Sequence, residues 1–424
     1  MIIDFTVSNF RSIRKKQTLS LFAESASNHL AENIARPGDE KIGVLRTVGI
    51  YGANASGKSN LLLAFEALRY IVCSSGDLKD GDTIPCYEPY LLAESSKTAP
   101  IEFEIEFFSK ESVRFIYSVA FNAERILSES LDFYPSRSKA NLFKRQEGDK
   151  WEDVAFGGHY KGGKKKFAFF DNNSYISKAG NSADAPELIR SIFNYFRTEI
   201  FHVGVNEPIG IFRWKNNQDL VNSIAEILSK VDTGIHGVSF KDQDVTEIKF
   251  PKDTPEFIRK RVLESESKKT VFLHRGDNGF QEEFTEDMES AGTTKLFNML
   301  PMLMDALDDG GVLILDELDN SFHPHLAELI IKLFNDPKLN RKNSQLIFST
   351  HNINLMSPSL LRRDQIWLTE KNNGETVFSS LDEFDKNTVK MDSPFGKWYC
   401  DGRFGAIPEI DFFAISKIIK DRIS

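Results

Sequence analysis

The chain has 424 residues, 41% hydrophobic and 27% charged, which is typical of a folded globular protein with a large core. Its net charge of −9 excludes a surface that attracts nucleic acid as a whole, so any such contact must be a local patch. Three cysteines without a C-x-x-C pair argue against a disulfide framework or a zinc site, and aspartates interrupt the longest apolar stretch, so we expect a cytoplasmic protein without a membrane contact.

The first part of the chain predicts strands around one helix. The first twenty residues alternate apolar and polar side chains, which predicts a strand, a turn and a second strand. Residues 44–51 predict a short buried strand, and residues 61–72 have the apolar spacing of a helix. Alternation in residues 101–108 and 113–121 predicts an antiparallel pair with one face in solvent.

Residues 122–289 are less regular. Helices are predicted at residues 185–197 and 218–230, and no heptad repeat indicates a coiled coil. After residue 292 helices and strands alternate, which predicts a parallel sheet covered by helices. The predicted elements of that last part are a helix ending near residue 307, a strand at 312–315, a helix at 325–334 and a strand at 345–349.

Residues 52–59 read GANASGKS, a complete G-x-x-x-x-G-K-S phosphate loop between a predicted strand and a predicted helix. Its glycines allow main-chain N–H groups to point at phosphate, at the N-terminus of a helix. Lys58 is expected to reach the β- and γ-phosphates of ATP, and Ser59 is expected to bind Mg²⁺. The predicted nucleotide-binding residues of this segment are Gly52, Asn54, Gly57, Lys58, Ser59 and Asn60.

Residues 311–317 read GVLILDE and predict a buried strand that ends in two acidic side chains. Asp316, at the carboxyl end of that strand, is expected to bind Mg²⁺. Glu317 is expected to be the general base that polarises the attacking water. No N-K-x-D string, which would recognise guanine, occurs in the chain, so ATP is the expected nucleotide.

Three smaller sequence features lie between or after these two motifs. Ser290 and Gly292 precede a predicted helix and could present a hydroxyl and N–H groups to phosphate, with an ordinary helix N-cap as the alternative. Asp319 lies in the turn after Asp316. His351 follows the strand at 345–349, which favours a position near a γ-phosphate over a purely structural histidine.

In this order the phosphate loop, ESAGT, LILDELD and STHN resemble the ATPase heads of the ABC class, in the SMC-like branch. Residues 8–12, SNFRS, resemble the opening segment of those heads. More narrowly, the chain is similar to stand-alone bacterial ATPases grouped as AAA15 or AAA21, including the AbiL and Rlo types of phage-resistance cassettes. The narrower likeness rests on LRRDQIW at 361–367, TEK at 369–371 and GRFGAIP at 402–408.

The resemblance implies an α/β fold, an ABC-type head with a mixed antiparallel sheet, a parallel core sheet and flanking helices. Lys58 and Asp316 are 258 positions apart, so an inserted mixed α/β subdomain is also expected. The implied domains are an N-terminal lobe at 1–121, an inserted subdomain at 122–284 and a C-terminal lobe at 285–424.

The resemblance also implies two ATP sites shared by a head-to-tail homodimer or a higher homo-oligomer. Lys58, Ser59, Asp316 and Glu317 would form one half of each site with ATP and Mg²⁺. The other roles implied are Ser290 and Gly292 capping the γ-phosphate of the opposite protomer, Asp319 coupling the sites, His351 sensing the γ-phosphate and Arg11 lying close to the nucleotide. The segment ESAGT departs from the L-S-G-G-Q of the wider class.

Three functions stay open. The leading hypothesis is an ATPase switch of an anti-phage defence system that controls a separate effector, such as a nuclease encoded nearby, because the chain carries no nuclease motif. The alternatives are a DNA repair or recombination ATPase and an ATP-dependent assembly scaffold without hydrolysis, against which Glu317 argues. The segment KGGKKK at 161–166 is a candidate nucleic-acid contact, with a solvated hairpin tip as the alternative.

Overall fold

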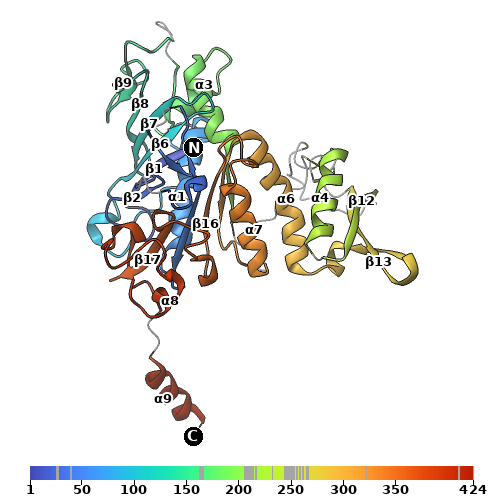
Figure 1. Cartoon of the computed structure of the whole chain (residues 1–424). Coiled ribbons are helices and arrows are strands. Elements are labelled where there is room, and N and C mark those ends of the chain that lie inside the picture. The colour runs from blue at the N-terminus through green and yellow to red at the C-terminus, as the bar shows by residue number, and fades with distance from the viewer. Residues whose placement is uncertain are drawn as a thin grey trace.

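Two large sheets with helices between and beside them form most of the protein in the computed structural model (Figure 1). Their combination of an antiparallel and a mainly parallel sheet confirms the predicted fold class. The structure describes residues 1–24, 28–38, 41–161, 167–204, 214, 217–231, 233–242, 254, 256, 259, 262–263, 267–320, 322–408 and 411–423.

The first sheet is antiparallel and has seven strands in the order β10-β9-β8-β7-β6-β1-β2. Alternation makes one face of β6 apolar: Phe103, Ile105 and Phe107 are buried, whereas Glu102 and Glu104 are exposed. The strands are β1 (Ile2–Ser8), β2 (Gln17–Ser20), β6 (Ile101–Phe108), β7 (Arg114–Phe121), β8 (Ile126–Phe133), β9 (Ala140–Arg145) and β10 (Ala155–Phe156).

The second sheet has six strands in the order β11-β15-β16-β5-β17-β18. The first five run parallel and β18 pairs antiparallel with β17. The strands are β5 (Thr47–Gly52), β11 (Ile200–Val203), β15 (Val312–Leu315), β16 (Gln345–Ser349), β17 (Ile366–Asn372) and β18 (Glu375–Ser380). Every residue of β15 and β16 is buried, which explains why both read as unbroken apolar runs or nearly so.

Helix α1 (Lys58–Cys73) lies between the two sheets, and its Phe65 stacks on Phe5 of β1 with ring centroids 4.0 Å apart. Alternate residues of β15 pack in two different hydrophobic clusters on opposite faces of the sheet. Ile314 belongs to the cluster that contains α1, and Leu313 belongs to the other. That second cluster is covered by α6 (Ala291–Asp309) and α7 (Pro324–Asn335). The parallel sheet is therefore buried on both faces.

A small unit stands beside α6, on the side away from the seven-stranded sheet (Figure 1). It consists of α4 (Gln218–Lys230) and the antiparallel strands β12 (Ile235–Asp242), β13 (Lys268–Arg275) and β14 (Gln281–Thr285). The other regular elements are β3 (Ile34–Ala35), β4 (Val44–Leu45), α2 (Tyr175–Gly180), α3 (Glu187–Asn194), α8 (Phe395–Cys400) and α9 (Phe412–Ile423).

The strand pairing differs from the predicted domain division at residue 122. Strands β8, β9 and β10 lie within residues 122–284 and yet extend the N-terminal sheet, because β7 offers them a free edge. Strand β11 pairs with β15 and so belongs to the parallel sheet. We propose that the inserted unit is confined to the region around residues 218–285, which packs on α6.

One further expectation can be compared with the described residues. The predicted helix at 185–197 is shorter, since α3 ends at Asn194 and a π-helical turn covers Tyr195–Glu199. Residues 162–166 of the KGGKKK segment lie outside the described residues. Within the described part of the chain, no helix is long and apolar enough to cross a membrane.

Candidate functional site

The phosphate loop connects the carboxyl end of β5 to the N-terminus of α1, as its sequence predicts. Gly57 precedes the helix with φ 111°, in the left-handed region that glycine adopts without strain. A Cβ at Gly57 would stand 2.1 Å from Thr376 Oγ1, and one at Gly52 would stand 2.3 Å from the Thr369 carbonyl. Both glycines are therefore required by close neighbours as well as by the turn.

Distant parts of the chain brace this loop. The hydroxyls of Ser56 and Thr369 are 2.7 Å apart, and Thr376 Oγ1 donates to the main-chain carbonyl of Ser56 at 2.7 Å. The main-chain N–H of Ala53 donates to the carbonyl of Ala406 at 3.1 Å. Two of the stretches singled out in the sequence, TEK and GRFGAIP, thus pack against the phosphate loop and fix its shape.

Lys58 is buried at the first position of α1, with 5% of its surface exposed. Its Nζ donates to the carbonyls of Gly52 at 3.0 Å and Ala53 at 3.1 Å, so the ammonium is held inside the curve of the loop. Burial lowers the pKa of Lys58, and the negative charges of the carboxylates in the segment 316–319 oppose that change. A phosphate would offer this cation stronger acceptors than two carbonyls.

The acidic turn follows β15, which is separated in the sheet from β5 and its phosphate loop by β16. Ser349, at the end of β16, donates its hydroxyl to Asp316 Oδ1 at 2.5 Å and accepts the main-chain N–H of Glu317 at 2.8 Å. Asp316 is nearly buried, whereas Glu317 has φ 52°, a strained value for a residue with a side chain. One serine therefore fixes the carboxylate of Asp316 and the sharp turn at Glu317.

Asp319 joins this turn to the end of β16. Its Oδ1 accepts the hydroxyl of Thr350 at 2.5 Å and the main-chain N–H of His351 at 3.2 Å. The ring of His351 reaches solvent, yet partial burial lowers its pKa and the positive charge of Lys58 adds to that effect. The structure thus brings Asp319, His351 and Lys58 to the same edge of the parallel sheet.

Arg11 lies at the side of the phosphate loop. It forms an ion pair with Glu88, and its Nη1 lies 3.5 Å from Oδ1 of Asn60. Both residues line a cavity of about 580 Å³, a volume within the usual range of small-molecule sites. Lys371, another lining residue, donates to the carbonyl of Ala55, so the cavity opens beside the loop.

Ser290 and Gly292 stand at the beginning of α6. Ser290 is the N-cap, and its Oγ accepts the main-chain N–H of Thr293 at 3.1 Å, as the N-cap alternative predicts. Ser290 is exposed, and among the described residues no hydrogen bond joins it to the phosphate loop of the same chain. A contact of this segment with phosphate stays a prediction.

Several contacts at the site were not predicted from the sequence. Ser349 is the last residue of β16, a strand that the sequence predicted. Its hydroxyl at the end of the strand that pairs with β15 was the signal that could have identified it as a partner of Asp316. Thr369 lies in a stretch that stood out only for its resemblance. No local pattern marks Lys295, whose Nζ donates to the carbonyls of Glu317 at 3.3 Å and Asn320 at 2.9 Å.

The donors at this edge suit Mg²⁺ together with a nucleotide. In the described part of the chain, no group of three or more His, Cys, Asp or Glu residues could hold a metal ion by itself. Ser59 in the first turn of α1 and Asp316 at the end of β15 offer only oxygen, and Mg²⁺ commonly takes its other ligands from phosphate and water. The three cysteines are free.

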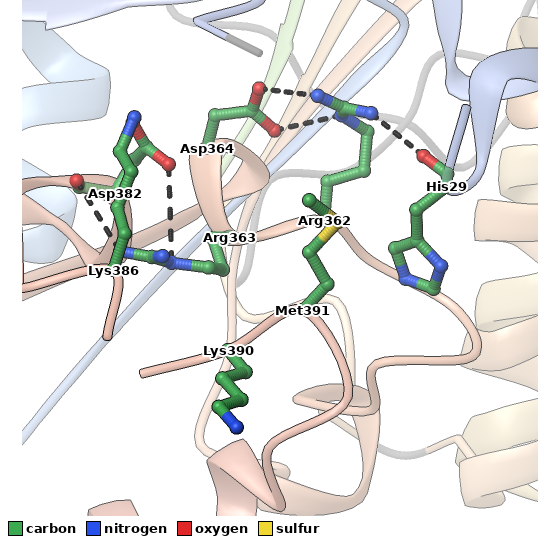
Figure 2. Close-up of a pocket in the computed structure, with 8 residues that line it drawn as sticks. All are labelled: His29, Arg362, Arg363, Asp364, Asp382, Lys386, Lys390 and Met391. Atoms are coloured by element: carbon green, nitrogen blue, oxygen red, sulfur yellow. Dashed lines mark hydrogen bonds and ion pairs between the residues drawn. The ribbon is translucent and has the colours of Figure 1, made fainter. Parts of the chain in front are cut away.

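The LRRDQIW stretch has a structural role at the opposite end of β17. Figure 2 shows Arg362 between Asp364 and the main chain of His29: two of its nitrogens lie 2.9 Å from the carboxylate oxygens and a third lies 2.7 Å from the carbonyl. Arg363 donates to the carbonyl of Phe384 at 2.7 Å. These buried guanidinium groups tie two loops to the amino end of the strand, away from the phosphate loop.

A family model described as "AAA domain, putative AbiEii toxin, Type IV TA system" matches residues 48–357, more than half of the chain. No functionally curated protein matches the sequence.

Three solved structures match the chain at low sequence identity. An SMC head domain from Thermotoga maritima has a TM-score of 0.39 and 14% identity, over 89% of this chain and 98% of that one. An SMC head bound to the C-terminal winged-helix domain of ScpA has a TM-score of 0.44 and 13% identity, over 90% and 99%. The recombination mediator RecF with ATP has a TM-score of 0.33 and 13% identity, over 83% and 93%.

Proposed function

The chain belongs to the AAA_21 family, and from that premise we propose that it is an ABC- and SMC-like ATPase that hydrolyses ATP in two sites shared by a head-to-tail pair of copies. The observation that carries the proposal is the position of Lys58. This buried cation lies inside a braced phosphate loop and near the carboxylates of the acidic turn. A charge of this kind at a helix N-terminus is suited to a triphosphate.

Each residue at the sheet edge then has a task in the proposal. Bound ATP with Mg²⁺ supplies a transferable γ-phosphoryl group. Lys58 would neutralise charge on the phosphates, and Ser59 and Asp316 would hold the metal. The strained turn keeps Glu317 available to orient and deprotonate a water molecule. His351, whose pKa is lowered by partial burial and by the charge of Lys58, would hydrogen-bond the γ-phosphate.

The cavity beside the loop is proposed for the nucleoside. It begins at Asn60, the second residue after Lys58, so a base and ribose there would continue from phosphates held by the loop. Arg11 and Lys371 add positive charge on the same side. This placement agrees with the prediction that Arg11 lies close to the nucleotide.

A second copy is proposed because one copy leaves part of the site open. The first N–H groups of α6 have no acceptor in a preceding helical turn, and this end of the helix is the positive end of its dipole, both of which suit phosphate. Ser290 there is exposed and makes no hydrogen bond to the loop of its own chain among the described residues. In a head-to-tail pair, Ser290 and Gly292 of one copy would close the site of the other.

Glu317→Gln tests this proposal. Without the base, the variant should bind ATP and Mg²⁺ normally but release phosphate at least about 100-fold more slowly, the usual contribution of general base catalysis. It should then accumulate as a dimer, measured by size-exclusion chromatography with light scattering. A variant that stays monomeric at saturating ATP contradicts the shared site, and a wild-type protein that binds ATP without releasing phosphate is an assembly scaffold instead.

The biological role proposed is a switch in anti-phage defence that controls a separate effector. Its support is the family description, which names a putative toxin of a type IV toxin–antitoxin system, together with the lack of a nuclease motif in the sequence. Tagged Glu317→Gln protein, expressed in the native host, should retain the effector better than Lys58→Ala protein does. Absence of any stable partner in both samples contradicts the role as a switch for a separate effector.

A further inference from the structure

Lys295 lies one and a half turns into α6, five residues after Ser290. Its Nζ donates to the carbonyl of Asn320 at 2.9 Å and to the carbonyl of Glu317 at 3.3 Å. These carbonyls belong to the first and last residues of the segment 317–320, so one cation holds both ends of the turn that carries the proposed base. The same Nζ lies 5.0 Å from the centre of the Phe322 ring.

The contacts of Lys295 favour a role in positioning the main chain over a role in an ion pair. No carboxylate of the described residues lies within 4.0 Å of its Nζ, and its hydrogen-bond acceptors are main-chain carbonyls. Burial lowers the pKa of Lys295, and the nearby carboxylates Asp319, Glu317 and Asp316 oppose the change. The lysine therefore holds the main chain of a turn whose carboxylates also influence its pKa.

The turn has two kinds of support. On one side the end of β16 holds it, through Ser349 at the N–H of Glu317 and Thr350 at the carboxylate of Asp319. On the other side α6 holds it, through Lys295. Of these two supports, the one from α6 comes from a helix whose beginning is exposed. The helix rises only about 7.5 Å over the five residues from Ser290 to Lys295.

We propose that Lys295 is a positioning residue that couples the two active sites of the dimer: phosphate bound at Ser290 and Gly292 fixes the beginning of α6, and Lys295 passes that position to Glu317 of the same chain. The proposal rests on the proposed function, since the phosphate at Ser290 is that of the partner's nucleotide. A shift at the beginning of α6 would reach the base directly, because a helix moves as a rigid element over so short a distance.

Lys295→Met tests the coupling, because methionine keeps much of the apolar stem and removes the donor. The variant should bind ATP and dimerise as the wild type does, since Lys58 and Ser290 are intact. Its kcat should fall roughly 5- to 150-fold, the range of typical coupling effects, with KM little changed. Lys295→Arg, which can still donate to both carbonyls, should restore at least part of kcat.

Amide hydrogen exchange gives a second readout that does not depend on turnover. In wild-type protein, ATP-driven dimerisation should slow exchange in residues 316–320; in Lys295→Met, these amides should exchange faster without nucleotide and respond less to dimerisation. Lys332→Met is the control, because Lys332 lies on α7 in an exposed ion pair with Glu328 and should change neither measurement.

The possible outcomes separate the two proposals. If wild-type protein and Glu317→Gln both fail to dimerise with ATP, the shared site is wrong. If they dimerise and Lys295→Met hydrolyses ATP at the wild-type rate, or loses activity with unchanged exchange in residues 316–320, the coupling role is wrong. Should Lys295→Met not fold, Lys295→Gln is measured by the same criteria.

Discussion

The two halves of the proposed ATP site are built differently. The phosphate-loop half is braced by Thr369, Thr376 and Ala406, and its lysine is buried. The other half, at Ser290, is an exposed helix N-terminus held by its own cap. A single copy thus contains one finished surface for phosphate and one that is open.

This difference suggests how the proposed switch would work. In the proposal the braced half would bind ATP already in a monomer, because contacts within the chain hold its shape. The open half contributes when a second copy brings a bound nucleotide to it, so ATP would be recognised first by one copy and then by both. Substitutions in the two halves should therefore affect binding and assembly separately.

The largest effect is expected in the braced half, from Lys58→Ala. Affinity of the monomer for ATP should fall at least about 100-fold, because two charge-assisted hydrogen bonds of roughly 1.5 kcal/mol or more are lost. Isothermal titration calorimetry measures it. Lys97→Ala is the control, since the Lys97 side chain forms an ion pair with Glu94 at the protein surface. Equal affinity of Lys58→Ala and wild type would show that the loop is not the phosphate site.

A smaller and different effect is expected in the open half. Ser290→Asp and Ser290→Asn both keep a good N-cap, so the stability of α6 should be preserved. Aspartate would place a negative charge against the partner's γ-phosphate and should reduce turnover at least about tenfold, since like charges a few ångströms apart repel strongly. Asparagine should retain most of the activity. Equal phosphate-release rates for the two variants would mean that the segment is only a helix cap.

The smallest effect concerns His351, two residues after the end of β16. Its pKa lies below the ordinary 6.5 because of partial burial and the charge of Lys58, so Lys58→Ala should raise it. Since the folded-state pKa is depressed, any contribution of the neutral ring to stability is present above pH 6.5 and is lost as the pH falls toward the folded-state value. An NMR titration without nucleotide measures the shift. An unchanged pKa in Lys58→Ala would place His351 away from the lysine.

The sequence was informative where function depends on neighbouring residues. The glycine–lysine string and the run GVLILDE each specify a strand end, so the phosphate loop and Asp316 could be placed from local patterns alone. The parallel strands were predictable for the same reason, since helices and strands alternate after residue 292.

The contacts that complete the site join residues far apart in the chain, and no local pattern could reveal them. Thr376 braces Ser56 from 320 positions away, and Lys295 reaches Glu317 across 22. The pairing of β8 with β7 escaped prediction for a related reason, because which strand edge is free depends on the whole sheet. Strand β8, which continues the N-terminal sheet, lies beyond residue 121, where the resemblance implied that the N-terminal lobe ends.

The most direct measurement is a structure of Glu317→Gln protein with ATP and Mg²⁺. The expected result is a head-to-tail pair in which Ser290 or Gly292 of one copy lies within about 3 Å of a γ-phosphate oxygen held by Lys58 of the other. A structure in which residues 290–293 are remote from every triphosphate would contradict the shared site.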